Sequence, residues 1–195
     1  MEKGERSRAA MVDACGELLR QVGYRGASMG KMIERSGAPR GSIYHHFPGG
    51  KDELVSEALL TSGARWRDHL AAVVEGEREL GPMLIAVCRE LAAHLEASDF
   101  RDGCPIATVA LEASADVPAV REACSTHFHE NEALIAARLV ATGVPAAQAA
   151  SVATLVLSTL EGALLLAKVY RDGSVLVRAG ETLAGLVETA LGRSA

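Results

Sequence analysis

The chain has 195 residues, of which 49% are hydrophobic and 23% charged, so it can bury a sizeable core. Aromatic residues make up only 4%, which favours helices over sheets, because strands are enriched in aromatic and β-branched residues. No apolar segment follows the charged N-terminus, which argues against a signal peptide. The longest apolar stretch contains Glu161, which argues against a membrane span. We therefore expect an all-α protein of the cytoplasm with no membrane partner.

The four cysteines predict neither a disulfide framework nor a metal site. They stand at positions 15, 88, 104 and 124, without a C-x-x-C pair or a zinc spacing, which is typical of reduced core thiols in a cytosolic protein. His127 and His129 are two residues apart, and on a helix such side chains diverge by about 200°, so they do not readily share one ion. We expect no metal and no cofactor.

The net charge of −5 is unevenly distributed along the chain. Residues 1–51 contain nine Lys or Arg and five Asp or Glu, a net charge of +4. Residues 52–195 contain eleven and twenty, a net charge of −9. A basic N-terminal segment on an acidic body favours a polyanionic partner for that segment.

Three helical patterns follow one another closely in the N-terminal fifty residues. Apolar residues recur at helical spacing over residues 6–22, and Gly23 is expected to end this helix. A short second helix follows the candidate N-cap Ser28 and stops at Gly37. A third, brief helix covers residues 40–46 and is closed by a Pro-Gly-Gly break.

The remaining residues predict six further helices and no strand. Acidic residues, prolines and serines suited to helix starts alternate with glycine-containing turns. The expected helices cover about 51–75, 81–98, 105–113, 118–141, 145–170 and 174–191.

Residues 28–47 have the layout of a helix-turn-helix, in which the second helix lies in the major groove of DNA. Small and polar residues surround the inward-facing Ile43 of that helix, and Phe47 also points inward, with His46 packing beside it. Side chains of this kind contact phosphates and base edges, and the start of a helix can hold a phosphate. The predicted DNA contacts are Ser28, Arg40, Gly41, Ser42, Tyr44, His45 and Lys51.

The segment from Ser28 to Phe47, followed by Lys51-Asp52-Glu53-Leu54, resembles the DNA-binding region of TetR-family repressors. The match covers roughly residues 6–60. Two departures from the family pattern are visible. Ser36 stands where Ala is usual, and the Pro48-Gly49-Gly50 link to the lysine is one residue longer.

Residues 103–112, Gly-Cys-Pro-Ile-Ala-Thr-Val-Ala-Leu-Glu, are similar to the C-terminal domain of the LmrA/YxaF-like subgroup, some of whose members respond to flavonoids or other planar drugs. The resemblance implies that the two final helices, about 145–171 and 175–191, form a four-helix bundle with a second subunit. The sequence agrees, because the penultimate helix has a wide apolar surface and small residues that permit close contact. The apolar set is Val152, Leu155, Val156, Thr159, Leu160, Ala163 and Leu164, and the small set is Ala149, Ala153, Ser158 and Gly162.

A ligand pocket in the body is expected to use aromatic, sulfur-containing and polar side chains. Glu161 stands out as a carboxylate in an apolar helix, where it would anchor a ligand or lie at an exposed dimer edge. The other candidates also fit ordinary core positions. The candidate pocket residues are Trp66, Met83, Cys88, Phe100, His127, Phe128, Asn131 and Glu161.

These patterns predict a dimeric, ligand-responsive transcriptional repressor with about nine helices. Residues 1–50 are the expected helix-turn-helix domain, and residues 51–195 the ligand-binding and dimerisation domain. The expected partners are a pseudo-palindromic operator in double-stranded DNA and a small apolar or aromatic inducer that releases it. A small helical enzyme is one alternative, but no convergent catalytic set is visible. A constitutive DNA binder without a ligand is the other.

Overall fold

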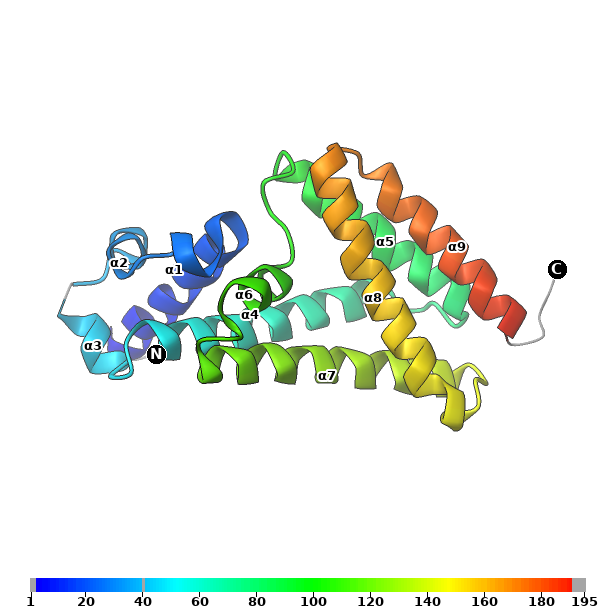
Figure 1. The fold of residues 1–195 in the computed structure, drawn as a ribbon, viewed down its shortest axis with the longest axis horizontal. Coiled ribbons are helices and arrows are strands. Elements are labelled where there is room, and N and C mark those ends of the chain that lie inside the picture. Colours follow the sequence, from blue (N-terminus) through cyan, green and yellow to red (C-terminus); the bar gives the residue numbers. More distant parts are fainter. Residues whose placement is uncertain (1–2, 40, 191–195) are drawn as a thin grey trace. The chain divides into compact units, whose positions relative to one another are not determined.

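The computed structural model describes residues 3–39 and 41–190, and within these ranges the chain forms nine helices and no strand (Figure 1). The expected all-α fold is confirmed, and each predicted helix is found within a few residues of its predicted bounds. The helices are α1 (Lys3–Gly26), α2 (Met29–Ser36), α3 (Ser42–His46), α4 (Lys51–Val73), α5 (Leu80–Ala97), α6 (Pro105–Ala113), α7 (Pro118–Ala141), α8 (Ala146–Tyr170) and α9 (Ser174–Ala190).

The helices group into two compact units, and α4 and α7 contribute residues to both. The first unit contains the described residues up to Trp66 together with Cys104–His127. The second contains Arg67–Gly103 and the described residues from Phe128 onward. The first unit therefore joins α6 to the N-terminal helices, although α6 lies far from them in the sequence.

The core of the first unit is built from the faces that the helical patterns predict. Met11, Cys15, Leu18 and Leu19 of α1 are buried, as expected from their spacing. Val22 has the same spacing but is 43% exposed, and α1 departs from helical geometry at the next residue, Gly23. Buried side chains from other segments of this unit complete the core, among them Met32, Ile43, Phe47, Leu54, Leu59, Ile106 and Val109.

In the second unit, α5, α8 and α9 pack against one another. Gly180 of α9 allows a close approach to α5, because a Cβ at this position would lie 2.8 Å from the Sγ of Cys88. Two apolar clusters lie in this unit. One includes Leu84, Leu139, Ala153, Val156 and Leu183, and the other includes Ala92, Leu95, Ala163, Ala167 and Leu176.

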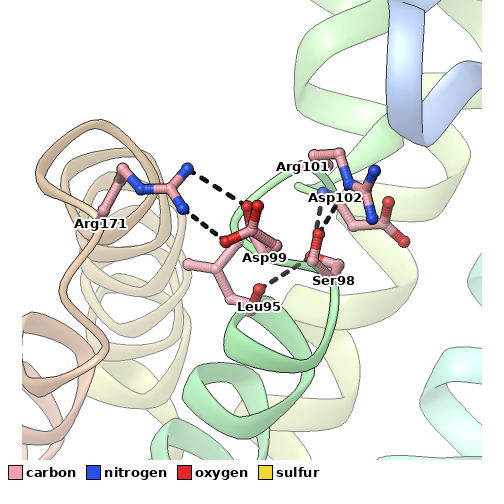
Figure 2. A network of polar contacts seen from close by, with 6 residues as sticks. All are labelled: Leu95, Ser98, Asp99, Arg101, Asp102 and Arg171. Atoms are coloured by element: carbon pink, nitrogen blue, oxygen red, sulfur yellow. Dashed lines mark hydrogen bonds and ion pairs between the residues drawn. The ribbon is translucent and has the colours of Figure 1, made fainter.

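A polar corner closes the end of this unit (Figure 2). Ser98 follows α5, donates its hydroxyl to the Leu95 carbonyl at 2.8 Å and accepts the Asp102 N–H at 3.1 Å. Arg171 follows α8 as its C-cap residue and forms an ion pair with Asp99 at 2.5 Å. The loop before α6 is therefore tied to the turn between α8 and α9.

Candidate DNA-binding site

The first helix of the predicted motif, α2, is defined at both ends by its own sequence. Ser28 is the N-cap, and its Oγ accepts a hydrogen bond from the Lys31 N–H at 3.4 Å. Gly37 ends the helix in the left-handed conformation, with φ of 65°. The Ser36 hydroxyl donates to the Ile33 carbonyl at 3.0 Å and accepts the Ala38 N–H at 3.3 Å. Ser36, which stands where Ala is usual, therefore stabilises the turn between α2 and α3.

The second helix, α3, is anchored from inside and open on its outer side. Ile43 and Phe47 are fully buried, as predicted. Tyr44 is 62% exposed and His45 is also exposed, so both side chains are accessible to a partner. Half-buried Ser42 donates its hydroxyl to the Pro39 carbonyl at 2.7 Å. The short helix thus presents a polar surface on an apolar support.

Two other predicted contacts, Arg40 and Gly41, precede α3 in the sequence. Gly41 is exposed and precedes the helix as its N-cap residue. Arg40 lies outside the described residues. His46 is half-buried and its ring meets that of His45 edge to face, with centroids 5.2 Å apart.

A cation–π contact and an ion pair fix the far end of α3 to its neighbours. The Arg8 guanidinium of α1 lies 4.9 Å from the centroid of the Phe47 ring and also pairs with Glu57 of α4. The Pro48-Gly49-Gly50 link makes a turn in which the Gly50 N–H donates to the Phe47 carbonyl at 2.9 Å. Gly50 has φ of 71°, and the Gly49 N–H donates to the Glu53 carboxylate at 2.7 Å. The longer link is thereby accommodated at the start of α4.

Lys51, predicted to hold a phosphate, is also engaged inside the protein. Its Nζ donates to the Tyr24 carbonyl at 2.6 Å and lies 4.0 Å from the centroid of the Tyr24 ring. The pKa of Lys51 is lowered, mainly because burial disfavours the charged ammonium. The Tyr24 hydroxyl donates to Asp52 at 2.6 Å, and burial together with this bond raises the pKa of Tyr24 to about 12. An ammonium has three donors, so Lys51 joins α1 to α4 with one of them.

The candidate ligand-pocket residues fall in both units and have different surroundings. In the first unit, Trp66 is half-buried, whereas His127 is buried with its ring in the space that a side chain at Gly63 would need. In the second unit, Met83 and Cys88 are buried. Phe100 is half-buried against the cluster around Leu176. Half-buried positions in the second unit are also occupied by Phe128, Asn131 and Glu161.

A surface cavity of about 440 Å³ in the second unit is lined by other, mostly polar residues. They are Arg78, Glu79, Ala141, Thr142 and Glu188. None of the candidate pocket residues lines this cavity.

An exposed apolar stripe runs along α8 and is shifted from the surface that the sequence pattern indicated. Val156 and Ala163 are buried in the protein's own core, and Val152, Leu160 and Leu164 pack against it. Of the apolar set named from sequence, Leu155 is the large exposed residue. The others on this stripe were missed, although i+11 and i+14 spacing from Leu155 finds Leu166 and Val169. The missed residues are Leu165, Leu166, Val169 and Tyr170, with Leu186 exposed on α9.

This same helix is the one among the described residues that is long and apolar enough to cross a membrane, by length and composition alone. Glu161 lies on this helix, and the helix packs against α5 and α9. The helix therefore has one face in a protein core and one face that the chain leaves uncovered.

The geometry and the fold together define a helix-turn-helix regulator, and comparisons with known proteins agree. Residues 12–58 match the profile of bacterial regulatory proteins of the TetR family. Residues 83–182 match the profile of the C-terminal domain of LmrA/YxaF-like transcriptional regulators.

Individual relatives cover most of the chain. An uncharacterised HTH-type transcriptional regulator of Mycobacterium tuberculosis is 40% identical over 174 residues, which are 85% of this chain and 86% of that protein. The HTH-type transcriptional regulator LmrA of Bacillus subtilis is 29% identical and covers 93% of this chain and 97% of its own length. The crystal structure of a TetR transcriptional regulator from Chloroflexus aurantiacus has a TM-score of 0.81 and 27% identity, with 97% of each chain covered.

The chain belongs to the TetR family of transcriptional regulators, with a C-terminal part of the LmrA/YxaF-like type. The resemblance inferred from residues 28–54 and 103–112 is therefore confirmed. Members of this family are DNA-binding regulators of transcription and not enzymes.

Proposed function

We propose that this protein represses transcription as a dimer on a pseudo-palindromic operator and is released by a small apolar or aromatic inducer. The observation that carries the proposal is the structure of α3, whose buried Ile43 and Phe47 leave Tyr44 and His45 exposed. An exposed polar face on a short, firmly anchored helix suits insertion into a major groove. Repression and cytoplasmic localisation are inferred here from the family.

The proposed DNA contacts divide into two kinds. Residues at helix starts, where backbone N–H groups bind anions, hold phosphates, and those on α3 reach base edges or adjacent phosphates. The Lys51 ammonium uses one N–H for its bond to the Tyr24 carbonyl, and its remaining N–H donors are proposed to bind a phosphate. The full proposed set is Ser28, Arg40, Gly41, Ser42, Tyr44, His45 and Lys51.

The proposed dimer interface is the exposed apolar stripe on α8 together with the adjoining face of α9. Leu165, Val169 and Tyr170 are each more than 60% exposed, and the exposure of large apolar side chains to water is unfavourable. A second copy covers such a face by presenting the same face. A dimer also doubles the base pairs read, with half-sites one helical turn, roughly 34–36 Å, or a multiple apart.

Residues 51–195 are proposed to hold the inducer as well as the dimer interface, with residues 1–50 as the DNA-binding domain. The proposed ligand contacts are Trp66 and His127 in the first unit, and Met83, Cys88, Phe100, Phe128, Asn131 and Glu161 in the second. The inducer shifts the equilibrium between two spacings of the DNA-binding domains only by its difference in affinity for the two states. Helix α4, which starts beside the motif and contributes to both compact units, is the proposed mechanical link.

Selection of bound duplexes from a random DNA pool tests this function, with binding of the recovered duplex repeated at several salt concentrations. We expect one inverted repeat, bound with an affinity that falls steeply as salt rises, because phosphate contacts release counterions. Recovery of unrelated sequences with equal affinity would contradict operator-specific binding. The recovered duplex then serves to screen planar and apolar compounds for release.

A further inference from the structure

Helix α1 is interrupted at Gly23, shortly before α2, the first helix of the DNA-binding motif, begins at Met29. Gly23 has φ of 65° and ψ of −172°, a combination that is essentially restricted to glycine. A last helical turn follows, in which the Ala27 N–H donates to the Gly23 carbonyl at 3.1 Å. Residues just after Gly23 therefore start a new turn, and backbone N–H groups at such a start need partners from elsewhere.

Glu112, near the end of α6, supplies that partner. Its Oε2 accepts a hydrogen bond from the backbone N–H of Arg25 at 3.0 Å. A Cβ at Gly23 would lie 2.5 Å from Oε1 and 2.7 Å from Oε2 of the same carboxylate. The carboxylate thus occupies the space beside the interruption, and both glycine at 23 and glutamate at 112 are needed for this arrangement.

The segment that Glu112 contacts leads directly into the helix-turn-helix. The Gly26 carbonyl accepts the Lys31 ammonium at 3.1 Å, Ala27 is fully buried, and Ser28 is the N-cap of α2. On the other side, the Tyr24 carbonyl accepts the Lys51 ammonium at the start of α4. All of these residues belong to the first compact unit.

We propose that Glu112 is a positioning residue for DNA binding. Its bond to the Arg25 N–H fixes the junction of α1 and α2 against α6, and so sets the orientation of α3, the helix proposed to enter the major groove. The inference rests on the proposed operator binding but concerns a residue outside the motif. Glu112 accepts a bond from the protein backbone and has no role as a DNA contact here.

Charge and position predict opposite effects of removing this side chain. Glu112 is an anion in the unit that binds a polyanion, so if charge alone mattered, its removal would strengthen DNA binding. If the bond to Arg25 matters, an alanine should weaken operator binding despite the loss of negative charge. Glutamine keeps an acceptor of nearly the same size without the charge, so it should preserve the position.

The first test compares Glu112→Ala, Glu112→Gln and the matched control Glu122→Ala, which removes an exposed glutamate from α7 in the same unit. Fluorescence anisotropy measures binding to the recovered operator and to an unrelated duplex of equal length. We expect Glu112→Ala to weaken operator binding about fivefold or more, and the other two variants to stay within about twofold of wild type. Operator binding by Glu112→Ala that equals or exceeds that of wild type overturns the inference.

Hydrogen exchange without DNA provides a second test that does not depend on operator binding. Glu112→Ala and the larger Glu112→Met, which fills the volume without an acceptor, should both speed amide exchange over residues 24–36 and leave α5 and α9 unchanged. Unchanged exchange over residues 24–36, or an equal increase in every helix, overturns the positioning role. Failure of the wild type to select a duplex would count against the proposed function and leave this test standing.

Discussion

Arg171, the residue that follows α8, forms an ion pair with Asp99 and places its guanidinium 5.3 Å from the centroid of the Phe100 ring (Figure 2 shows the ion pair). All three residues have φ between 53° and 58°, a left-handed conformation that non-glycine residues adopt only at some cost. The corner between the α5 loop and the α8–α9 turn therefore depends on side-chain contacts that offset an unfavourable backbone.

Replacement of Arg171 separates these two effects. Arg171→Ala loses the ion pair and retains the left-handed cost, whereas Arg171→Gly loses the pair and relieves the cost. We expect the alanine variant to be less stable than the glycine variant by about 1 kcal/mol, and the exposed ion pair itself to contribute less than about 1 kcal/mol. Urea unfolding at one fixed protein concentration measures both. A glycine variant that is the less stable of the two would contradict the backbone argument.

Tyr44→Ala should weaken operator binding by about tenfold or more, because it removes a hydroxyl and an aromatic surface from the exposed side of α3. The thermal midpoint should remain close to that of wild type, since the side chain is mostly outside the core. Tyr44→Phe is the matched control for the hydroxyl and should have a smaller effect. Unchanged affinity of the alanine variant would remove Tyr44 from the proposed contacts.

Gly23→Ala should destabilise the first compact unit by about 1–3 kcal/mol, because the backbone conformation there is almost exclusive to glycine. A Cβ would also meet the Glu112 carboxylate. Combining it with Glu112→Ala relieves the steric part but leaves the backbone part, so the two substitutions should be non-additive. Gly30→Ala in the exposed part of α2 is the control and should be neutral or slightly stabilising. Additive effects in the double variant would show that the steric part is negligible.

Leu165→Glu tests the proposed dimer interface. A charge in the middle of an apolar face that two copies bury should dissociate the dimer and abolish operator binding at concentrations where wild type binds. Leu134→Glu, at an exposed position on α7, is the control and should leave the mass in solution unchanged. Sedimentation velocity gives the outcome directly. A Leu165→Glu protein that remains dimeric would move the interface away from this stripe.

Thiol labelling tests the burial of three of the four cysteines. Burial raises the pKa of the Cys15 thiol to about 12 and those of Cys88 and Cys124 to about 11. At pH 8 these groups are protonated almost completely, and the thiolate is the form that reacts, so all three should resist N-ethylmaleimide. Half-buried Cys104, at the start of α6, should react first. Mass spectrometry should find one label per folded chain and four after unfolding; early modification of Cys15 would contradict its burial.

The sequence was sufficient for the order and type of the helices, because caps, glycines and apolar periodicity act locally. The sequence also predicted that Ile43 and Phe47 point inward, because a short helix has only one face against the core and these are its apolar residues. It could not distinguish the two apolar faces of α8, since Val152 and Leu165 are both apolar and only packing against other helices separates them.

The sequence also could not predict contacts between residues that are distant along the chain. Lys51 was expected to face a phosphate, and its bond to the Tyr24 carbonyl depends on how α1 and α4 pack. The same holds for Gly23, which the sequence indicated as a helix end, because the carboxylate beside it is that of Glu112 from α6. The candidate pocket has the same character, because Trp66 and Phe128 are far apart in the sequence and fall in different compact units.

The bond between Glu112 and Arg25 has a consequence for engineered chimaeras. Exchanging residues 1–50 between relatives treats the DNA-binding segment as a portable module, yet one of its backbone partners is encoded in α6. A DNA-binding segment with Gly23, joined to a C-terminal part that has no acceptor at position 112, would lose this hydrogen bond. A segment with a bulky residue at position 23 would also lose it, because that side chain would clash with Glu112. In hybrid regulators made from this protein, α6 should therefore be exchanged together with residues 1–50, or Gly23 and Glu112 should be restored after the exchange.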